Sequence, residues 1–174
     1  MELKTVKVYN FDELSDKVKE KVLNKFRELN GYSFLEENLK EYLSELLEEN
    51  EIKETGETTL RYSLSYSQGD GVSFIGNFNY KGFDFIIELG SLSNYYSHSR
   101  TTDISTADDD DDKSDITEEL REIREKEFKD NYFLICDLLE KRGYNYIEAE
   151  DSEENIKETI EANEYKFLSN GEIF

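Results

Sequence analysis

Residues 58–90, TTLRYSLSYSQGDGVSFIGNFNYKGFDFIIELG, decide the fold of this chain. Apolar and aromatic side chains alternate with polar ones in three runs, 58–66, 72–80 and 83–90, and the turns between the runs contain glycine. Period-two runs joined by short turns predict an antiparallel three-stranded meander with one buried face. The side chains expected on that face are Leu60, Tyr62, Leu64, Phe83, Phe85 and Ile87.

Two helices are predicted before the meander. In a capping box, an N-cap residue and the residue three positions later satisfy each other's backbone amides, and Asn10 with Glu13 fits this pattern. The amphipathic helix that follows is expected to end at Asn30-Gly31. Ser33 with Glu36 forms a second box before another amphipathic helix. We expect the two helices to form an N-terminal hairpin.

One long helix is predicted in the C-terminal half of the chain. Asp115 with Glu118 supplies a third capping box, and apolar residues then recur at helical spacing. Gly143 is expected to stop the helix just after Arg142. Because its apolar residues share one face, which includes Cys136, we expect this helix to pack on the sheet.

Short elements are predicted at the two ends of the chain. Val6 and Val8 flank a lysine and indicate a brief first strand. Asp151 with Glu154 indicates the start of a short helix. Asn170-Gly171 lies between two short runs and predicts a closing hairpin on a type I′ turn.

These elements together predict a single acidic α+β domain over residues 1–174. Its antiparallel sheet would carry the helices on one side. Residues 91–113 lack a stable period and are expected to form a loop with a short strand near 100–104; the acidic part of this loop spans 105–113. A chain of this length can bury a sizeable core, and 11 Phe and 12 Tyr supply large side chains for it.

The composition also indicates a compartment. Cys136 is the only cysteine, so an internal disulfide is excluded and a reducing environment is expected. The chain opens without an apolar stretch, and no apolar run approaches the ~20 residues that a membrane helix needs. We therefore expect a cytoplasmic protein that does not contact membranes.

The net charge of −21 is concentrated in three segments. Residues 36–57 hold nine acidic and two basic residues, residues 108–127 hold eleven and four, and residues 148–164 hold eight and one. Each segment therefore carries −7, and the rest of the chain is neutral. The charge follows particular stretches of the sequence and is not spread evenly.

Two interpretations of this charge stay open. Acidic runs are commonly the solvated faces of helices. A concentrated acidic surface also repels nucleic acid and attracts the basic proteins that bind nucleic acid, because complementary fields accelerate association. The residues expected to contact such a partner are Glu45, Glu48, Glu49 and Glu51 of the second helix and Asp108, Asp109, Asp110, Asp111 and Asp112 of the acidic loop.

A metal site is the second candidate for function. Asp70 lies between two glycines in the first turn of the meander, where it suits a tight turn or can project as a ligand. His98 is the only histidine and follows the third strand. If the meander brings these residues together, Asp70, His98 and Asp103, or Glu88 in place of Asp103, can supply mixed ligands that suit zinc or manganese.

Four stretches resemble a loosely defined family of small, acidic phage and prophage proteins from low-GC Gram-positive bacteria. They are Tyr9-Asn10-Phe11-Asp12-Glu13-Leu14-Ser15, Ser67-Gln68-Gly69-Asp70-Gly71-Val72-Ser73-Phe74, Tyr95-Tyr96-Ser97-His98 and Ile160-Glu161-Ala162-Asn163-Glu164-Tyr165-Lys166-Phe167. The resemblance implies an accessory phage protein in the cytoplasm of a bacterial host. Some small acidic proteins of this origin are anti-CRISPR inhibitors of Cas9-type nucleases.

The resulting hypothesis is a non-enzymatic inhibitor that binds a host nucleic-acid-handling protein through its acidic surfaces, with a Cas9-type nuclease as the preferred target. Such nucleases hold nucleic acid in positively charged channels that an acidic surface can occupy instead. The alternatives are a small metal-binding protein or metal-dependent enzyme centred on Asp70 and His98, and an antitoxin-like or structural phage protein.

Overall fold

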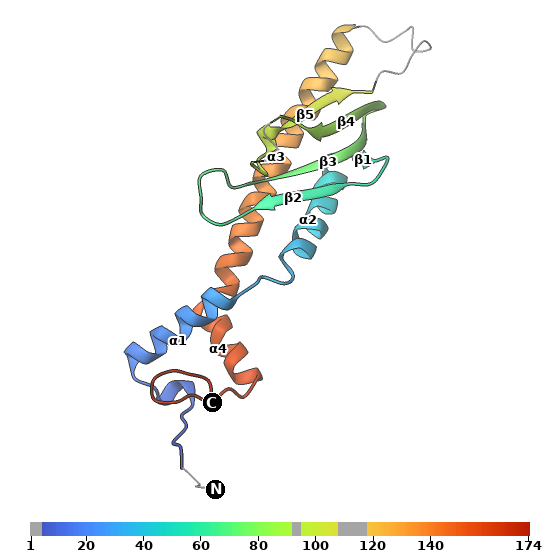
Figure 1. Ribbon diagram of the computed structural model, residues 1–174. Coiled ribbons are helices and arrows are strands. Elements are labelled where there is room, and N and C mark those ends of the chain that lie inside the picture. Colours follow the sequence, from blue (N-terminus) through green and yellow to red (C-terminus); the bar gives the residue numbers. More distant parts are fainter. Residues whose placement is uncertain (1–4, 92–94, 108–117) are drawn as a thin grey trace. The chain divides into compact units, whose positions relative to one another are not determined.

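The computed structural model describes residues 5–91, 95–107 and 118–174, which contain four α-helices and an antiparallel sheet (Figure 1). The predicted α+β class is thereby confirmed. The chain divides into two compact units, one running from Phe34 to Tyr144 and the other built from the residues before and after it. The predicted single domain over residues 1–174 stays a prediction. No helix in the described ranges is long and apolar enough to cross a membrane.

The predicted meander is confirmed in the central unit. Strand β3 pairs on one side with β4 and on the other with β1 and β2, and β5 pairs with the far side of β4. The strands are β1 (Ile52–Glu54), β2 (Thr59–Ser63), β3 (Gly71–Tyr80), β4 (Phe83–Leu89) and β5 (Thr102–Thr106). The strand expected near 100–104 is therefore β5, preceded by a 3₁₀ turn, η2 (Ser99–Thr101). Strand β1 was not predicted, because its three residues contain one apolar side chain and show no period.

The sheet buries one face, as predicted, but the predicted side chains contribute unequally. Phe85 and Ile87 are buried, whereas Leu60, Tyr62, Leu64 and Phe83 are only half-buried. Strand β3 supplies the other large core residues, including Phe74. The ring of Phe85 stacks on Phe128 of helix α3 (Glu118–Glu150) with centroids 4.1 Å apart, and Phe74 packs on Tyr132 of the same helix at 4.8 Å. These contacts confirm that the long helix packs on the sheet.

Helix α3 (Glu118–Glu150) continues through Gly143, where a stop was predicted. A Cβ at Gly143 would lie 2.3 Å from Cδ1 of Leu64, so the missing side chain makes room for the segment after β2. Close packing therefore explains why this position is a glycine. Glycine is about 1 kcal/mol less favourable than alanine inside a helix, and the packing outweighs this cost. Asp115, the predicted cap, lies outside the described residues.

Helix α2 (Leu35–Glu49) buries one apolar stripe. With α1 (Asp16–Leu29) it gives an N-terminal pair of helices, but the two helices belong to different units, so their packing as the predicted hairpin stays a prediction. Its N-cap is Phe34, which makes no side-chain cap hydrogen bond, so the predicted box at Ser33 and Glu36 does not form. The buried stripe consists of Leu35, Leu39, Leu43, Leu46 and Leu47. The carboxylates of α2 therefore point away from the core.

The second unit begins with a short turn and helix α1 (Asp16–Leu29). The predicted capping box is present, since the backbone amide of Asn10 donates to a carboxylate oxygen of Glu13 at 2.7 Å. It caps only the 3₁₀ turn η1 (Phe11–Glu13), because the next residue, Leu14, adopts extended backbone. The helix then starts after Ser15 and ends where predicted, at Asn30.

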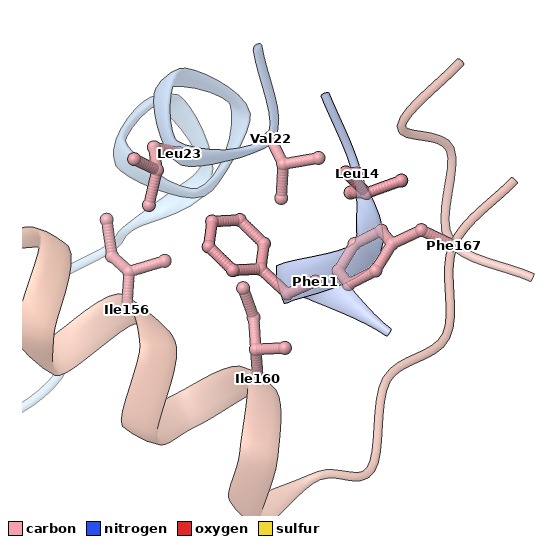
Figure 2. Close-up of a cluster of buried hydrophobic side chains, with 7 residues drawn as sticks. All are labelled: Phe11, Leu14, Val22, Leu23, Ile156, Ile160 and Phe167. Atoms are coloured by element: carbon pink, nitrogen blue, oxygen red, sulfur yellow. The ribbon is translucent and has the colours of Figure 1, made fainter. Parts of the chain in front are cut away.

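The core of this unit joins segments from both ends of the chain (Figure 2). Phe11 of η1 and Phe167 near the C-terminus meet edge to face, with centroids 6.3 Å apart. Helices α1 and α4 (Glu153–Ala162) contribute the aliphatic side chains around them. The buried residues are Phe11, Leu14, Val22, Leu23, Ile156, Ile160 and Phe167. The unit thus has a hydrophobic cluster of its own.

The chain ends differ from expectation in three details. Residues 5–8 form no strand, and only Tyr9 makes a β-bridge, to Phe167. The N-cap of α4 is Ser152, because Asp151 instead accepts a hydrogen bond from the Tyr32 hydroxyl at 2.8 Å.

The predicted closing hairpin forms, with Phe167 bridging Ile173. A type I′ turn requires positive φ at both of its central residues. Of Asn170 and Gly171, only Gly171 has positive φ, at 85°, so the predicted turn type was wrong.

Candidate functional site

The turn between β2 and β3 is organised around the carboxylate of Asp70. The hydroxyl of Ser67 donates to Oδ1 at 2.9 Å, and those of Ser63 and Ser65 donate to the same atom at 3.1 Å. Oδ2 accepts the backbone amides of Ser65 at 2.7 Å and Ser67 at 2.9 Å. The hydroxyl of Tyr144, from α3, donates to Oδ2 at 2.6 Å. Asp70 therefore holds its own turn and connects that turn to the long helix.

This environment stabilises the ionised form of Asp70. The carboxyl is 8% exposed, and burial alone would raise its pKa. The hydrogen bonds donated by Tyr144, Ser67 and Ser65 outweigh burial and hold the pKa of Asp70 well below its usual range. Burial and the bond to Asp70 in turn raise the pKa of Tyr144 to about 12. The pair is thus a permanently charged acceptor with a permanently protonated donor at neutral pH.

The same carboxylate fixes the backbone around Tyr66. The two amides that it accepts belong to the residues on either side of Tyr66, whose φ of 56° lies in the left-handed region. A non-glycine residue in this region is uncommon and persists only where its surroundings enforce it. The Tyr66 ring is 66% exposed and packs against Tyr144, with centroids 4.7 Å apart.

The structure places His98 next to this turn. A Cβ on Gly71 would lie 2.9 Å from Cα of His98, so the two backbones are in close approach. Nδ1 of His98 accepts a hydrogen bond from the backbone amide of Arg100 at 3.1 Å and so caps η2. The ring therefore has a structural role as an N-cap.

Asp103 lies elsewhere on the sheet, in the middle of β5. It is exposed and stands opposite Glu88 of β4 in the strand register. Within residues 5–91, 95–107 and 118–174, no three His, Cys, Asp or Glu side chains form a group that could hold a metal ion. The zinc or manganese site of Asp70, His98 and Asp103 stays a prediction, and Asp70 already has its acceptor capacity used by hydrogen bonds.

The acidic face of α2 is exposed, as the predicted partner-binding surface requires. Glu45, Glu48 and Glu49 lie on the solvent side of the helix, and Glu51 follows it in the turn before β1. Lys40, the one basic residue of α2, pairs with Glu36 at 2.6 Å. The other proposed contacts, Asp108 to Asp112, lie outside the described residues.

Sequence reasoning missed the partners of Asp70. Ser63, Ser65 and Ser67 occur at alternate positions just before it, and short serines near an aspartate favour side-chain-supported turns. That spacing was therefore a usable signal for a carboxylate-centred turn. Tyr144 had no local signal, because it lies 74 positions away.

Comparison of the chain with protein-family models, with curated proteins and with solved structures finds no match.

Proposed function

We propose that this protein is a phage-type accessory inhibitor that binds a basic, nucleic-acid-handling protein of a bacterial host through acidic surfaces, with an RNA-guided nuclease of the Cas9 type as its target. The binding is non-catalytic. Its effect is to occupy the positively charged channel that otherwise holds nucleic acid.

The exposed face of α2 is the observation that carries this proposal. Glu37, Glu41, Glu45 and Glu48 follow one another at spacings of four, four and three residues, which places them on one side of a helix. All four are exposed, and none forms a salt bridge within the described parts of the chain. The stripe extends over about 16 Å at 1.5 Å per residue.

This arrangement lowers the stability of the isolated helix. Like charges at a spacing of four residues cost about 0.2–0.5 kcal/mol per pair. Solubility alone requires net charge and does not require that the charges be aligned. A basic partner would relieve the repulsion, so the alignment supports binding more than it supports solubility.

The experiment is co-purification with a host lysate or a purified Cas9-type nuclease, using two reversal variants of equal charge. The test variant changes Glu45, Glu48, Glu49 and Glu51 to Lys. The control variant changes Glu20, Glu28, Glu88 and Asp130 to Lys; these residues are also exposed and lie outside the three acidic segments. Both variants raise the net charge from −21 by the same amount.

We expect the test variant to lose the partner and the control variant to keep it. Equal loss in both variants would show that only total charge matters, and retention in both would show that α2 is not the contact surface. Circular dichroism establishes that each variant remains folded.

A further inference from the structure

The central unit carries a second exposed surface with its own chemistry. It combines aromatic rings from two loops with carboxylates and a tyrosine from one face of α3. We call it the tyrosine–carboxylate surface and define it as Tyr66, Tyr96, Asp137, Glu140 and Tyr144. Tyr66 and Tyr96 are 66% and 45% exposed. Exposed rings of this size are typical of protein-binding surfaces, where tyrosine is enriched.

The aromatic side chains of this surface are held in place. Asp70 fixes the backbone on both sides of Tyr66, and the Tyr66 ring lies against Tyr144. A Cβ on Gly69 would lie 2.5 Å from Cδ1 of Tyr96, so the Tyr96 ring covers this glycine directly. Both rings are thus attached to one turn. Pre-ordered tyrosines lose little conformational entropy when a partner binds.

Among the described residues, the carboxylates of this surface form no salt bridge. Asp137, Glu140 and Tyr144 are spaced three and four residues apart and therefore share one face of α3. Within the described residues, no cation lies at salt-bridge distance from Glu140. Burial, together with the charges of Asp137 and Asp70, raises the pKa of Glu140 even though His98 acts in the opposite direction. A positive group placed here would be stabilised.

We propose that the tyrosine–carboxylate surface binds an arginine side chain of the protein partner, with the guanidinium stacked on Tyr66 and paired with Glu140. Arginine fits better than lysine, because its planar group stacks on aromatic rings and donates two parallel hydrogen bonds to a carboxylate. Stacking of nucleic-acid bases on the same rings is disfavoured, since Asp137 and Glu140 repel phosphates. This inference rests on the proposed function, in that it specifies the chemistry of a basic partner.

The test is an NMR titration of the intact protein at low salt with two acetylated and amidated pentapeptides, Gly-Arg-Gly-Arg-Gly and Gly-Lys-Gly-Lys-Gly. We expect the arginine peptide to bind more tightly and to shift the signals of Tyr66, Glu140 and Tyr144. Tyr66→Gly and Glu140→Gln should each weaken its binding roughly three- to tenfold. Tyr66→Gly should at the same time leave the free energy of unfolding unchanged or higher, because glycine accepts the positive φ without strain. If Tyr66 had only a structural role, Tyr66→Gly would lower the free energy of unfolding instead.

Ile123→Ala is the matched control, since Ile123 is 46% exposed and lies 17 positions before Glu140 on the same helix, about 25 Å away. Equal binding of the two peptides, or equal loss in the control, would overturn the arginine site. Signals that shift only on α2 would overturn it while leaving the proposed function intact. If neither peptide bound, the arginine site would be overturned as well. Loss of the partner by the α2 reversal variant would in that case still support the proposed function.

Discussion

The hydroxyl of Tyr144 lies 2.6 Å from Oδ2 of Asp70, and this contact joins the turn between β2 and β3 to the long helix α3. The two residues are 74 positions apart in the chain. The bond therefore fixes tertiary structure, and five further donors from the serine-rich turn complete the shell of Asp70.

Replacing Asp70 by Ala should lower the free energy of unfolding by about 3–5 kcal/mol, because six hydrogen-bond donors lose their acceptor at once. Tyr144→Phe removes one bond to a charged group and should cost about 1.5–3 kcal/mol. Urea denaturation measures both. Asp103→Ala is the control and should change stability by less than about 0.5 kcal/mol, since that carboxylate is exposed. Equal effects at positions 70 and 103 would contradict a central role for the Asp70 carboxylate.

The same carboxylate predicts a pH dependence. The pKa of folded Asp70 lies below the value of about 3.9 expected for the unfolded chain. Its stabilisation is therefore complete above that value and is lost as the pH falls below it toward the folded pKa. The stability difference between the wild type and Asp70→Asn should shrink between pH 5 and pH 2. A constant difference would show that Asp70 titrates normally in the fold.

Gly143→Ala should destabilise the protein, although alanine is the better helix former. The added Cβ would meet Cδ1 at the end of the Leu64 side chain, which must shift to make room, and overpacking of this kind costs about 1–3 kcal/mol. In a Leu64→Ala background the clash is gone, and the same change should stabilise by up to about 1 kcal/mol. A double-mutant cycle measures the change of sign. The same sign in both backgrounds would show that Leu64 does not explain the glycine.

The metal prediction is tested by elemental analysis and by melting in a chelator. If the protein binds no metal, Tm should not change when EDTA is added. About one equivalent of zinc or manganese after dialysis, released by His98→Ala, would establish the site instead.

Regular elements with several periods were predictable from the sequence, whereas features that depend on tertiary contacts were not. The meander and α3 follow from repeated apolar spacing, and the buried Phe85 was placed correctly. The stop at Gly143 was wrong because a glycine inside a helix and one after a helix look alike until the packing partner is known. Tyr144 could not be connected to Asp70 for the same reason, since only the fold brings them together.

Association of the purified protein with a guide-loaded Cas9-type nuclease, measured as a rate at increasing salt, tests the proposed function most directly. Because the proposed contact consists of many aligned charges, we predict that the association rate falls steeply between 50 and 300 mM salt and that target DNA competes with the protein. Reversal of Glu45, Glu48, Glu49 and Glu51 should abolish the fast phase. Absence of binding, or binding whose rate is independent of salt and which leaves DNA binding unchanged, would contradict the account.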